Sequence, residues 1–133
     1  MGKTIVVDAN VLCSALLGGK PGSILFDERF QFVTAEYTLN EVKKYVPMLA
    51  DKLSLPNEYL HEMLGGLPVF VYDDAWYASG ITEAERMIGH IDAKDVPILA
   101  LALRLGAPLW SQDAHFDQCG YLEVIKTRHF FEH

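Results

Sequence analysis

Residues 3–8 read KTIVVD, and this stretch predicts more about the fold than any other. Its β-branched residues form an uninterrupted apolar run, Ile5, Val6 and Val7, which ends at the carboxylate of Asp8. A strand with one face in water alternates apolar and polar side chains, whereas a run without alternation indicates a strand buried on both faces. Strands of that kind belong to parallel sheets. We therefore expect a buried strand of a parallel sheet that delivers Asp8 at its carboxyl end.

The rest of the chain alternates between helical and strand-like patterns separated by short loops, with no linker and no repeat. We expect Pro47 to kink or divide the helix that contains it, and Pro97 to lie in the first turn of its helix, where an amide has no partner anyway. Predicted strands cover residues 30–35, 68–72, 108–111 and 122–126, and predicted helices cover residues 10–17, 36–53, 56–65, 81–91 and 92–105. This order predicts one domain over residues 1–133, a three-layer α/β/α sandwich around a mainly parallel sheet.

The composition is that of an ordered globular protein, since 50% of the 133 residues are hydrophobic and 22% are charged. The longest apolar runs fall short of the ~20 residues that cross a bilayer, so we expect no membrane span. Asp8 and Asn10 interrupt the apolar segment of any N-terminal signal, which predicts a cytoplasmic protein. Cys13 and Cys119 show no metal or redox spacing, and we expect both to be reduced and buried.

The net charge of −7 argues at first against a nucleic-acid partner, because phosphate binding normally uses a basic surface. Two bound divalent cations would add four positive charges and weaken that objection without removing it. We therefore expect affinity for such a partner to come from bound metal and from a local basic patch. Candidates for the patch are Lys20, Lys43, Lys44, Lys94 and Arg104, of which Lys94 stands between two acidic residues.

Acidic residues stand where predicted strands end and helices begin. Asp8 and Asp113 follow strands, Asp95 lies in the first turn of a helix, and Glu41 lies on the helix after the second strand. Ligands of open parallel sheets bind outside the carboxyl ends of the strands, so we expect these carboxylates to converge there. Close carboxylates repel one another unless a cation is bound. Mg²⁺ or Mn²⁺ is the natural occupant, because both ions prefer oxygen ligands.

Four short motifs resemble those of the PIN-domain ribonucleases, which include VapC-like toxins and PilT N-terminus-like small PIN proteins. They read VDANVL at residues 7–12, NEV at 40–42, DAKDVP at 92–97 and SQDAHF at 111–116. The order and spacing of the motifs both fit the family. The resemblance covers nearly the whole chain, from residue 3 to the final predicted strand.

The resemblance implies a Mg²⁺- or Mn²⁺-dependent endoribonuclease in which a metal-bound water attacks the scissile phosphate. Asp8, Glu41 and Asp95 would ligate one metal, and Asp113 would complete that site or hold a second ion. Hydrolysis would leave a 5′-phosphate and a 3′-hydroxyl. Asn10, Asp92 and Ser111 would act as a second shell of hydrogen-bonding groups around the ligands.

Plainer interpretations of the same residues stay open at this point. Asp8 is also a favoured helix N-cap, Asp92 and Asp95 could complement a helix dipole, and Glu41 could be a solvated helix residue. We expect Asp117 to be an exposed turn residue and His115 to be a loop residue outside the site. The terminal group His129, Phe130, Phe131 and His133 has no metal-ligand spacing, and its phenylalanines could dock the C-terminus.

Two other functions compete with the nuclease interpretation. A phosphoaspartyl phosphatase would place a second aspartate where Asn10 stands, which disfavours that class. A catalytically silent PIN-like module that binds RNA or protein is the alternative to the nuclease.

The expected partners are an RNA substrate, a cognate antitoxin that inserts an arginine or an apolar helix into the acidic groove, and a second copy of the chain. Exposed Tyr45, Met48, Leu60 and Met63 would favour the homodimer.

Overall fold

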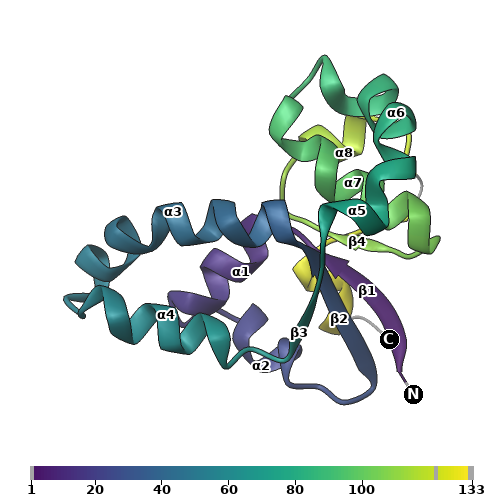
Figure 1. Ribbon diagram of the computed structural model, residues 1–133. Helices are drawn as coiled ribbons and strands as arrows, with labels where there is room; N and C mark the ends of the chain where they lie inside the picture. Colours follow the sequence, from purple (N-terminus) through teal and green to yellow (C-terminus); the bar gives the residue numbers. More distant parts are fainter. Residues whose placement is uncertain (1, 122, 132–133) are drawn as a thin grey trace.

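The structure is a computed structural model that describes residues 2–121 and 123–131. Five strands form one sheet in the order β3-β2-β1-β4-β5, and every neighbouring pair is parallel. The expectation of a parallel sheet is therefore confirmed, with the strand of the KTIVVD stretch at its centre (Figure 1). Of the predicted last strand, Leu122 lies outside the described residues. The strands are β1 (Lys3–Val7), β2 (Phe30–Ala35), β3 (Val69–Tyr72), β4 (Leu109–Trp110) and β5 (Val124–Ile125).

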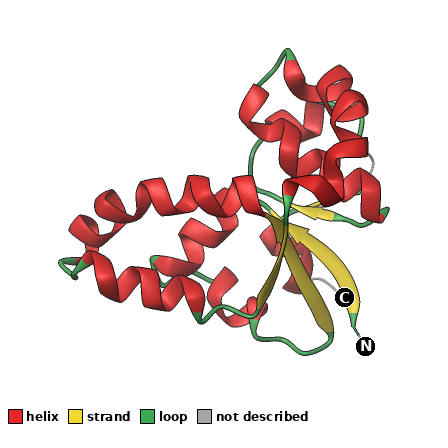
Figure 2. Ribbon diagram, viewed as in Figure 1, coloured by secondary structure: helices red, strands yellow, loops and turns green. Residues whose placement is uncertain are grey.

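Helices cover both faces of the sheet, so the predicted three-layer arrangement is also confirmed (Figure 2). One face carries α1 (Ala9–Leu16), α2 (Pro21–Leu25), α3 (Glu36–Leu53) and α4 (Asn57–Gly65). The other face carries α5 (Asp74–Tyr77), α6 (Ile81–Ala84), α7 (Val96–Leu105) and α8 (His115–Gln118). Single turns of 3-10 helix occur at Ala78–Gly80, Ala93–Asp95 and Thr127–Phe131, and a π-helical turn at Glu85–Gly89.

The central strand contributes to two separate cores, which is the reason for its unbroken apolar run. Ile5 and Val7 pack against α1 to α4, while Val6 points to the opposite face and packs against α7. Each of these side chains is at most 1% exposed. The first core is closed near the C-terminus by Phe130, whose ring centroid lies 4.5 Å from that of Trp110. Burial of the strand on both faces therefore accounts for its composition.

The order of the strands creates a crevice beside β1. The chain passes from β1 to β2 and then to β3, and afterwards returns to form β4 on the other side of β1. The connections that leave β1 and β4 therefore lie on opposite faces of the sheet, which opens a cleft at the carboxyl ends of these two strands. Asp8 directly follows β1, and Ser111 directly follows β4. The fold thus brings these two residues to the place where such sheets bind ligands.

Two further expectations can be compared with the structure. Both cysteines are free thiols, and Cys119 is buried whereas Cys13 is only half-buried. Within residues 2–121 and 123–131, no helix combines the length and the apolar character that crossing a membrane requires.

The expectation that Pro47 divides its helix is wrong, because α3 runs without interruption from Glu36 to Leu53. Proline removes one helical hydrogen bond and crowds the carbonyl four residues earlier, which belongs here to Lys43. Both Pro47 and Lys43 are exposed, so water can solvate the freed carbonyl. The opposite side of the helix holds a buried apolar stripe that keeps it in place: Val42, Val46, Leu49 and Ala50.

We predict that Pro47→Ala stabilises the protein, because a proline inside a helix costs up to about 3 kcal/mol relative to alanine. Since tertiary packing already holds α3, the expected gain in the free energy of unfolding is about 1 to 3 kcal/mol, measured by urea denaturation. The control Lys43→Ala, in the same helix, should change it by less than about 0.5 kcal/mol. A loss of stability in Pro47→Ala would show that α3 needs the proline for its shape.

Candidate active site

A cavity of about 520 Å³ opens at the crevice beside β1. Its acidic lining comes from four separate segments of the chain. On the other side, α1 and α3 contribute an apolar wall. The acidic residues are Asp8, Glu41, Asp92, Asp95 and Asp113, and the apolar wall includes Cys13, Leu17, Tyr45, Met48 and Leu49. All four carboxylates predicted as ligands therefore line one cavity.

Asp8 is both a helix cap and a member of this cavity, so the two interpretations of this residue are compatible. One carboxylate oxygen accepts a hydrogen bond from the backbone N–H of Ala9 at 2.8 Å, which caps α1. The other oxygen accepts from the Ser111 hydroxyl at 2.7 Å and from the Asn10 amide at 3.2 Å. Asp8 is only 5% exposed, so these three donors fix its orientation inside the protein.

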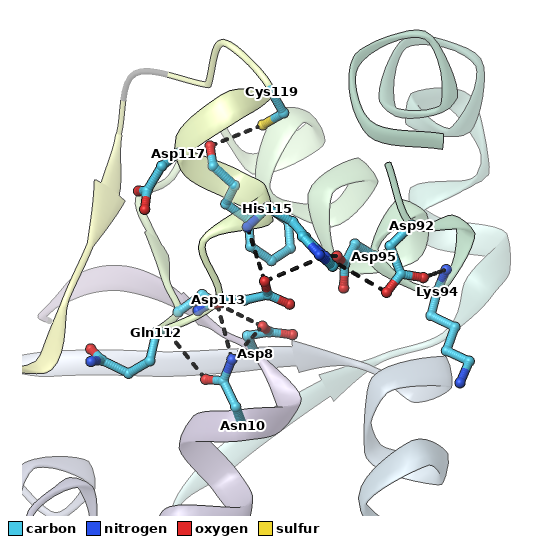
Figure 3. A network of polar contacts seen from close by, with 12 residues as sticks. Asp8, Asn10, Asp92, Lys94, Asp95, Gln112, Asp113, His115, Asp117 and Cys119 are labelled. Carbon is cyan, nitrogen blue, oxygen red and sulfur yellow. Dashed lines mark hydrogen bonds and ion pairs between the residues drawn. The ribbon is translucent and has the colours of Figure 1, made fainter. Parts of the chain in front are cut away.

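A hydrogen-bond network connects the loops after β1 and β4 (Figure 3). The Asn10 amide also donates to the Ser111 hydroxyl at 3.3 Å, and its own oxygen accepts from the Gln112 backbone N–H at 3.3 Å. The Ser111 hydroxyl oxygen in turn accepts from the Asp113 backbone N–H at 3.0 Å. Asn10 and Ser111 therefore both bind the Asp8 carboxylate, and Ser111 also holds the backbone of Asp113.

Asp92 and Asp95 enter the cavity from the turn that precedes α7. The Asp92 carboxylate accepts from the Lys94 backbone N–H at 3.0 Å and so caps the 3-10 turn Ala93–Asp95. This turn places Asp95 at the start of α7, where it is 8% exposed. Pro97 follows in the first turn of α7, as predicted. The short turn brings both carboxylates to the same side of the cavity.

The expectation that His115 lies outside the site is wrong. His115 is the first residue of α8, and its Nδ1 lies 3.2 Å from an oxygen of Asp95 and 3.3 Å from one of Asp113 (Figure 3). An oxygen of Asp92 is 3.7 Å away. The Asp113 carboxylate accepts a hydrogen bond from the His115 backbone N–H at 2.9 Å, which fixes the start of α8 beside that carboxylate. In the sequence, an aspartate two residues before a histidine at the start of a helix was the feature from which this contact could have been predicted.

The packing of these carboxylates perturbs their protonation. Burial raises the pKa of Asp95 to about 6; the His115 hydrogen bond opposes this rise, and the charges of Asp8, Asp113 and Asp92 add to it. Burial likewise raises the pKa of Asp8, although the Ser111 hydrogen bond opposes it. The hydrogen bond to Asp95 raises the pKa of the half-exposed His115. The cluster therefore attracts positive charge, either protons or a cation.

Glu41 lies across the cavity, on α3. Its carboxylate is 3.7 Å from the Lys44 ammonium and is 13% exposed. Burial raises the pKa of Tyr37, and the neighbouring Glu41 carboxylate raises it further. Glu41 is thus a directed cavity residue with two neighbours, and not the freely solvated helix residue of the plainer interpretation.

Other predicted residues lie elsewhere. Asp117 points away from the cluster and forms an ion pair with Lys126 at 3.1 Å, which agrees with the expectation of an exposed turn residue (Figure 3). The expected basic patch does not form, since only Lys94 of its five members lines the cavity. Lys20 lies over Phe131, Arg104 lies over Trp76, and Lys43 lines a different cavity.

The donor atoms fit a divalent cation. One ligand atom from each of Asp92, Asp95 and His115 lies within 4.8 Å of the other two, and Asp8, Asp113 and Glu41 line the same cavity. Carboxylate oxygens suit Mg²⁺ and Mn²⁺, and an imidazole nitrogen adds a ligand that Mn²⁺ accepts more readily than Mg²⁺ does. The arrangement can therefore hold a metal ion and present it to a ligand in the open cavity.

We predict that Asp95→Asn stabilises the metal-free protein at pH 7 and not at pH 4. The pKa of Asp95 in the fold, about 6, exceeds its ordinary value of 3.8, so protonation favours the folded state and this stability is lost as the pH rises through 6. Urea denaturation in EDTA should show a gain of about 1 to 3 kcal/mol at pH 7.

The matched control is Asp51→Asn, an exposed aspartate on α3, which should change little at either pH. Equal destabilisation of Asp95→Asn at both pH values would show that the carboxylate matters as a structural acceptor and not as a buried charge.

Comparisons with known proteins give one matching family model and several similar solved structures. A family model described as PIN domain matches residues 6–131. A search of curated protein sequences gave no match.

Similar solved structures include VapBC2 from Rickettsia felis bound to a DNA fragment from their promoter, with a TM-score of 0.66, 16% identity and coverage of 92% of this chain and 98% of that chain. Mycobacterium tuberculosis VapC20, described as a Sarcin-Ricin loop cleaving toxin, has a TM-score of 0.63, 16% identity and coverage of 90% and 98%. FitAcB from Neisseria gonorrhoeae has a TM-score of 0.59, 20% identity and coverage of 92% and 95%. Because the family model spans nearly the whole sequence, this chain belongs to the PIN-domain family.

Proposed function

We propose that this PIN domain is a metal-dependent endoribonuclease that hydrolyses RNA phosphodiester bonds. The observation that carries the proposal is the convergence of Asp8, Asp95 and Asp113 with Glu41 in one open cavity at the end of β1. Buried carboxylates this close together are unfavourable in the folded protein unless something positive binds to them. A site that is costly without a cation and open to solvent suits metal-assisted chemistry on a phosphate.

In this proposal Asp8, Glu41, Asp95 and Asp113 hold Mg²⁺ or Mn²⁺. The bound cation would stabilise charge on the scissile phosphate and favour ionisation of an attacking water. Ser111 and Asn10 keep the Asp8 carboxylate pointing into the cavity through their hydrogen bonds. Asp92 shapes the turn that presents Asp95. The remaining cation at the rim, Lys94, is placed to contact a phosphate of the RNA.

His115 adds a nitrogen donor to that set. Its Nδ1 lies 3.2 Å and 3.3 Å from oxygens of Asp95 and Asp113. In an octahedral shell with bonds of about 2.1 Å, neighbouring ligand atoms are about 3 Å apart, so these separations suit atoms that share one metal. We therefore include His115 among the ligands and expect a preference for Mn²⁺ over Mg²⁺.

The similarity to VapC20, a Sarcin-Ricin loop cleaving toxin, supports RNA as substrate and a role as the toxin of a toxin-antitoxin pair. We propose that it acts in the cytoplasm. An antitoxin would cover the apolar wall of the cavity, where Leu17, Tyr45 and Met48 are 38%, 40% and 51% exposed. The same surface could serve a homodimer. Leu60 is fully buried and Met63 packs against the core. Contrary to the expectation from the sequence, neither residue is available for a homodimer interface.

Purified protein should cleave total RNA with Mn²⁺ or Mg²⁺ and lose that activity in EDTA. Asp8→Asn and Asp95→Asn should each lower the rate by at least about 100-fold, because each removes a charged metal ligand. Asp51→Asn, outside the cavity, is the control. Full activity in EDTA or in both variants would refute the carboxylate mechanism. RNA binding without cleavage would support the alternative, a catalytically silent binding module.

The His115 assignment has its own spectroscopic test. Mn²⁺ bound to the protein should show nitrogen coupling in pulsed electron paramagnetic resonance, and His115→Gln should remove it. His61→Gln, which changes an exposed histidine on α4, should retain it. Bound Mn²⁺ without nitrogen coupling in the wild-type protein would show that the imidazole is a hydrogen-bonding neighbour of the carboxylates and not a ligand.

A further inference from the structure

Gln112 lies between two residues of the carboxylate site, Ser111 and Asp113, and has no part in the chemistry proposed above. Its exposed side chain extends away from the carboxylates, whereas its backbone N–H donates to Asn10 (Figure 3). The side chain and the backbone of this one residue therefore contact different parts of the molecule. Each contact can be followed to a residue that is firmly held.

The side chain of Gln112 contacts the 3-10 turn Thr127–Phe131 near the C-terminus. Its amide oxygen accepts a hydrogen bond from the Thr127 backbone N–H at 2.6 Å. The Thr127 hydroxyl in turn accepts a hydrogen bond from the indole N–H of Trp110, a fully buried residue, at 3.0 Å. The Phe130 ring of the same turn packs on Trp110 and on the first core. The turn therefore attaches the Gln112 side chain to the core of the protein.

The backbone of Gln112 acts on the Asn10 amide. The Gln112 N–H donates to the Asn10 amide oxygen at 3.3 Å, and the Asn10 amide nitrogen donates to Asp8 at 3.2 Å. An asparagine side chain has one acceptor end and one donor end, and half a rotation of the amide exchanges them. After such a rotation the amide oxygen would face the Asp8 carboxylate, so that two acceptors would meet. An N–H bound to the Asn10 oxygen therefore keeps the donor end on Asp8.

We propose that Gln112 is a positioning residue of the carboxylate site, which connects the C-terminal turn to Asp8 through Asn10. The attached side chain holds the Gln112 peptide in place, the peptide orients the Asn10 amide, and the amide orients the Asp8 carboxylate. Groups outside the ligands influence metal affinity in this way, because they fix the direction in which a ligand points. The inference rests on the proposed nuclease function, since it names what holds one ligand of that site.

Ser111 gives the same Asp8 oxygen a second support, which limits the size of the effect. Its hydroxyl donates to that oxygen at 2.7 Å, and its own backbone N–H donates to the Ile125 carbonyl at 3.1 Å. Neither contact involves the Gln112 side chain. Loss of that side chain should therefore weaken the site without abolishing it, unlike the loss of the Asp8 carboxylate itself.

The competing explanation is that Gln112 only fastens the C-terminal turn. In that case its loss would leave the Asn10 amide as ordered as before. Both hydrogen bonds of Gln112 lie at the surface, where water can replace a lost partner, so neither contributes much to the stability of the whole protein. The order of the Asn10 amide therefore distinguishes a positioning role from a purely structural one.

The first test is nuclear magnetic relaxation of the Asn10 side-chain amide in the metal-free protein. Gln112→Met keeps the length of the side chain but removes the acceptor oxygen, and it should lower the amide order parameter from about 0.85 to below about 0.6. Gln112→Glu retains an acceptor for the Thr127 N–H and should restore the rigid value. Gln118→Met, which changes an exposed glutamine of α8, should have no effect. An amide that is equally rigid in Gln112→Met would overturn the inference.

The second test is calorimetric titration with Mn²⁺. Gln112→Met should weaken binding about 3- to 10-fold, less than the 10- to 100-fold typical of groups that contact a ligand directly. In protein that already carries Asn10→Ala, the same substitution should change the affinity less than about twofold, because its influence passes through Asn10. Unchanged affinity in Gln112→Met alone, or a full effect in the double variant, would overturn the inference. If the wild-type protein binds no Mn²⁺, the nuclease proposal fails, and the order of the Asn10 amide still decides the role of Gln112.

Discussion

Burial of several carboxylates close together at the carboxyl end of β1 is the constraint on which this site depends. Asp8 and Asp95 are almost fully buried, and burial raises the pKa of both above the ordinary range of aspartate. A fold that holds acidic groups in this way loses stability near neutral pH unless a cation compensates for them. The rest of the molecule can be understood as the framework that keeps these groups together in spite of that cost.

The framework is rigid where the charges meet. Parallel pairing of β1 with β4 brings Asp8 and Ser111 into hydrogen-bond contact, although they are 103 residues apart in sequence. Helices pack against both faces of β1, and this packing holds the strand, and with it Asp8, at the crevice. Local turns then add their own carboxylates. Asp92 and Asp113 each accept a backbone N–H two residues further on, so each turn is stabilised by the residue that the site uses.

Helix α3 lines two separate cavities with different sides of its first turns. One side of its first turns carries Glu41 toward the carboxylate cavity, and the other side carries Glu36 and Asn40 toward the cavity that contains Tyr77. Because neighbouring positions on a helix point in different directions, a single helix can serve two adjacent pockets.

The sequence alone determined the parallel α/β architecture and the identity of four carboxylates in one cavity. Both depend on patterns of neighbouring residues that can be recognised without the tertiary structure. An unbroken β-branched run requires burial on two faces, and Asp8, Asp95 and Asp113 occupy strand exits and a helix start that can be located from those patterns. Glu41 was harder to assign, since an isolated glutamate on a helix resembles any solvated residue. Only the tertiary structure decided that α3 continues through Pro47, because packing of its apolar stripe outweighs the local cost of proline. It alone also placed His115 among the carboxylates and joined Gln112 to the C-terminal turn, since both depend on contacts between segments distant in sequence.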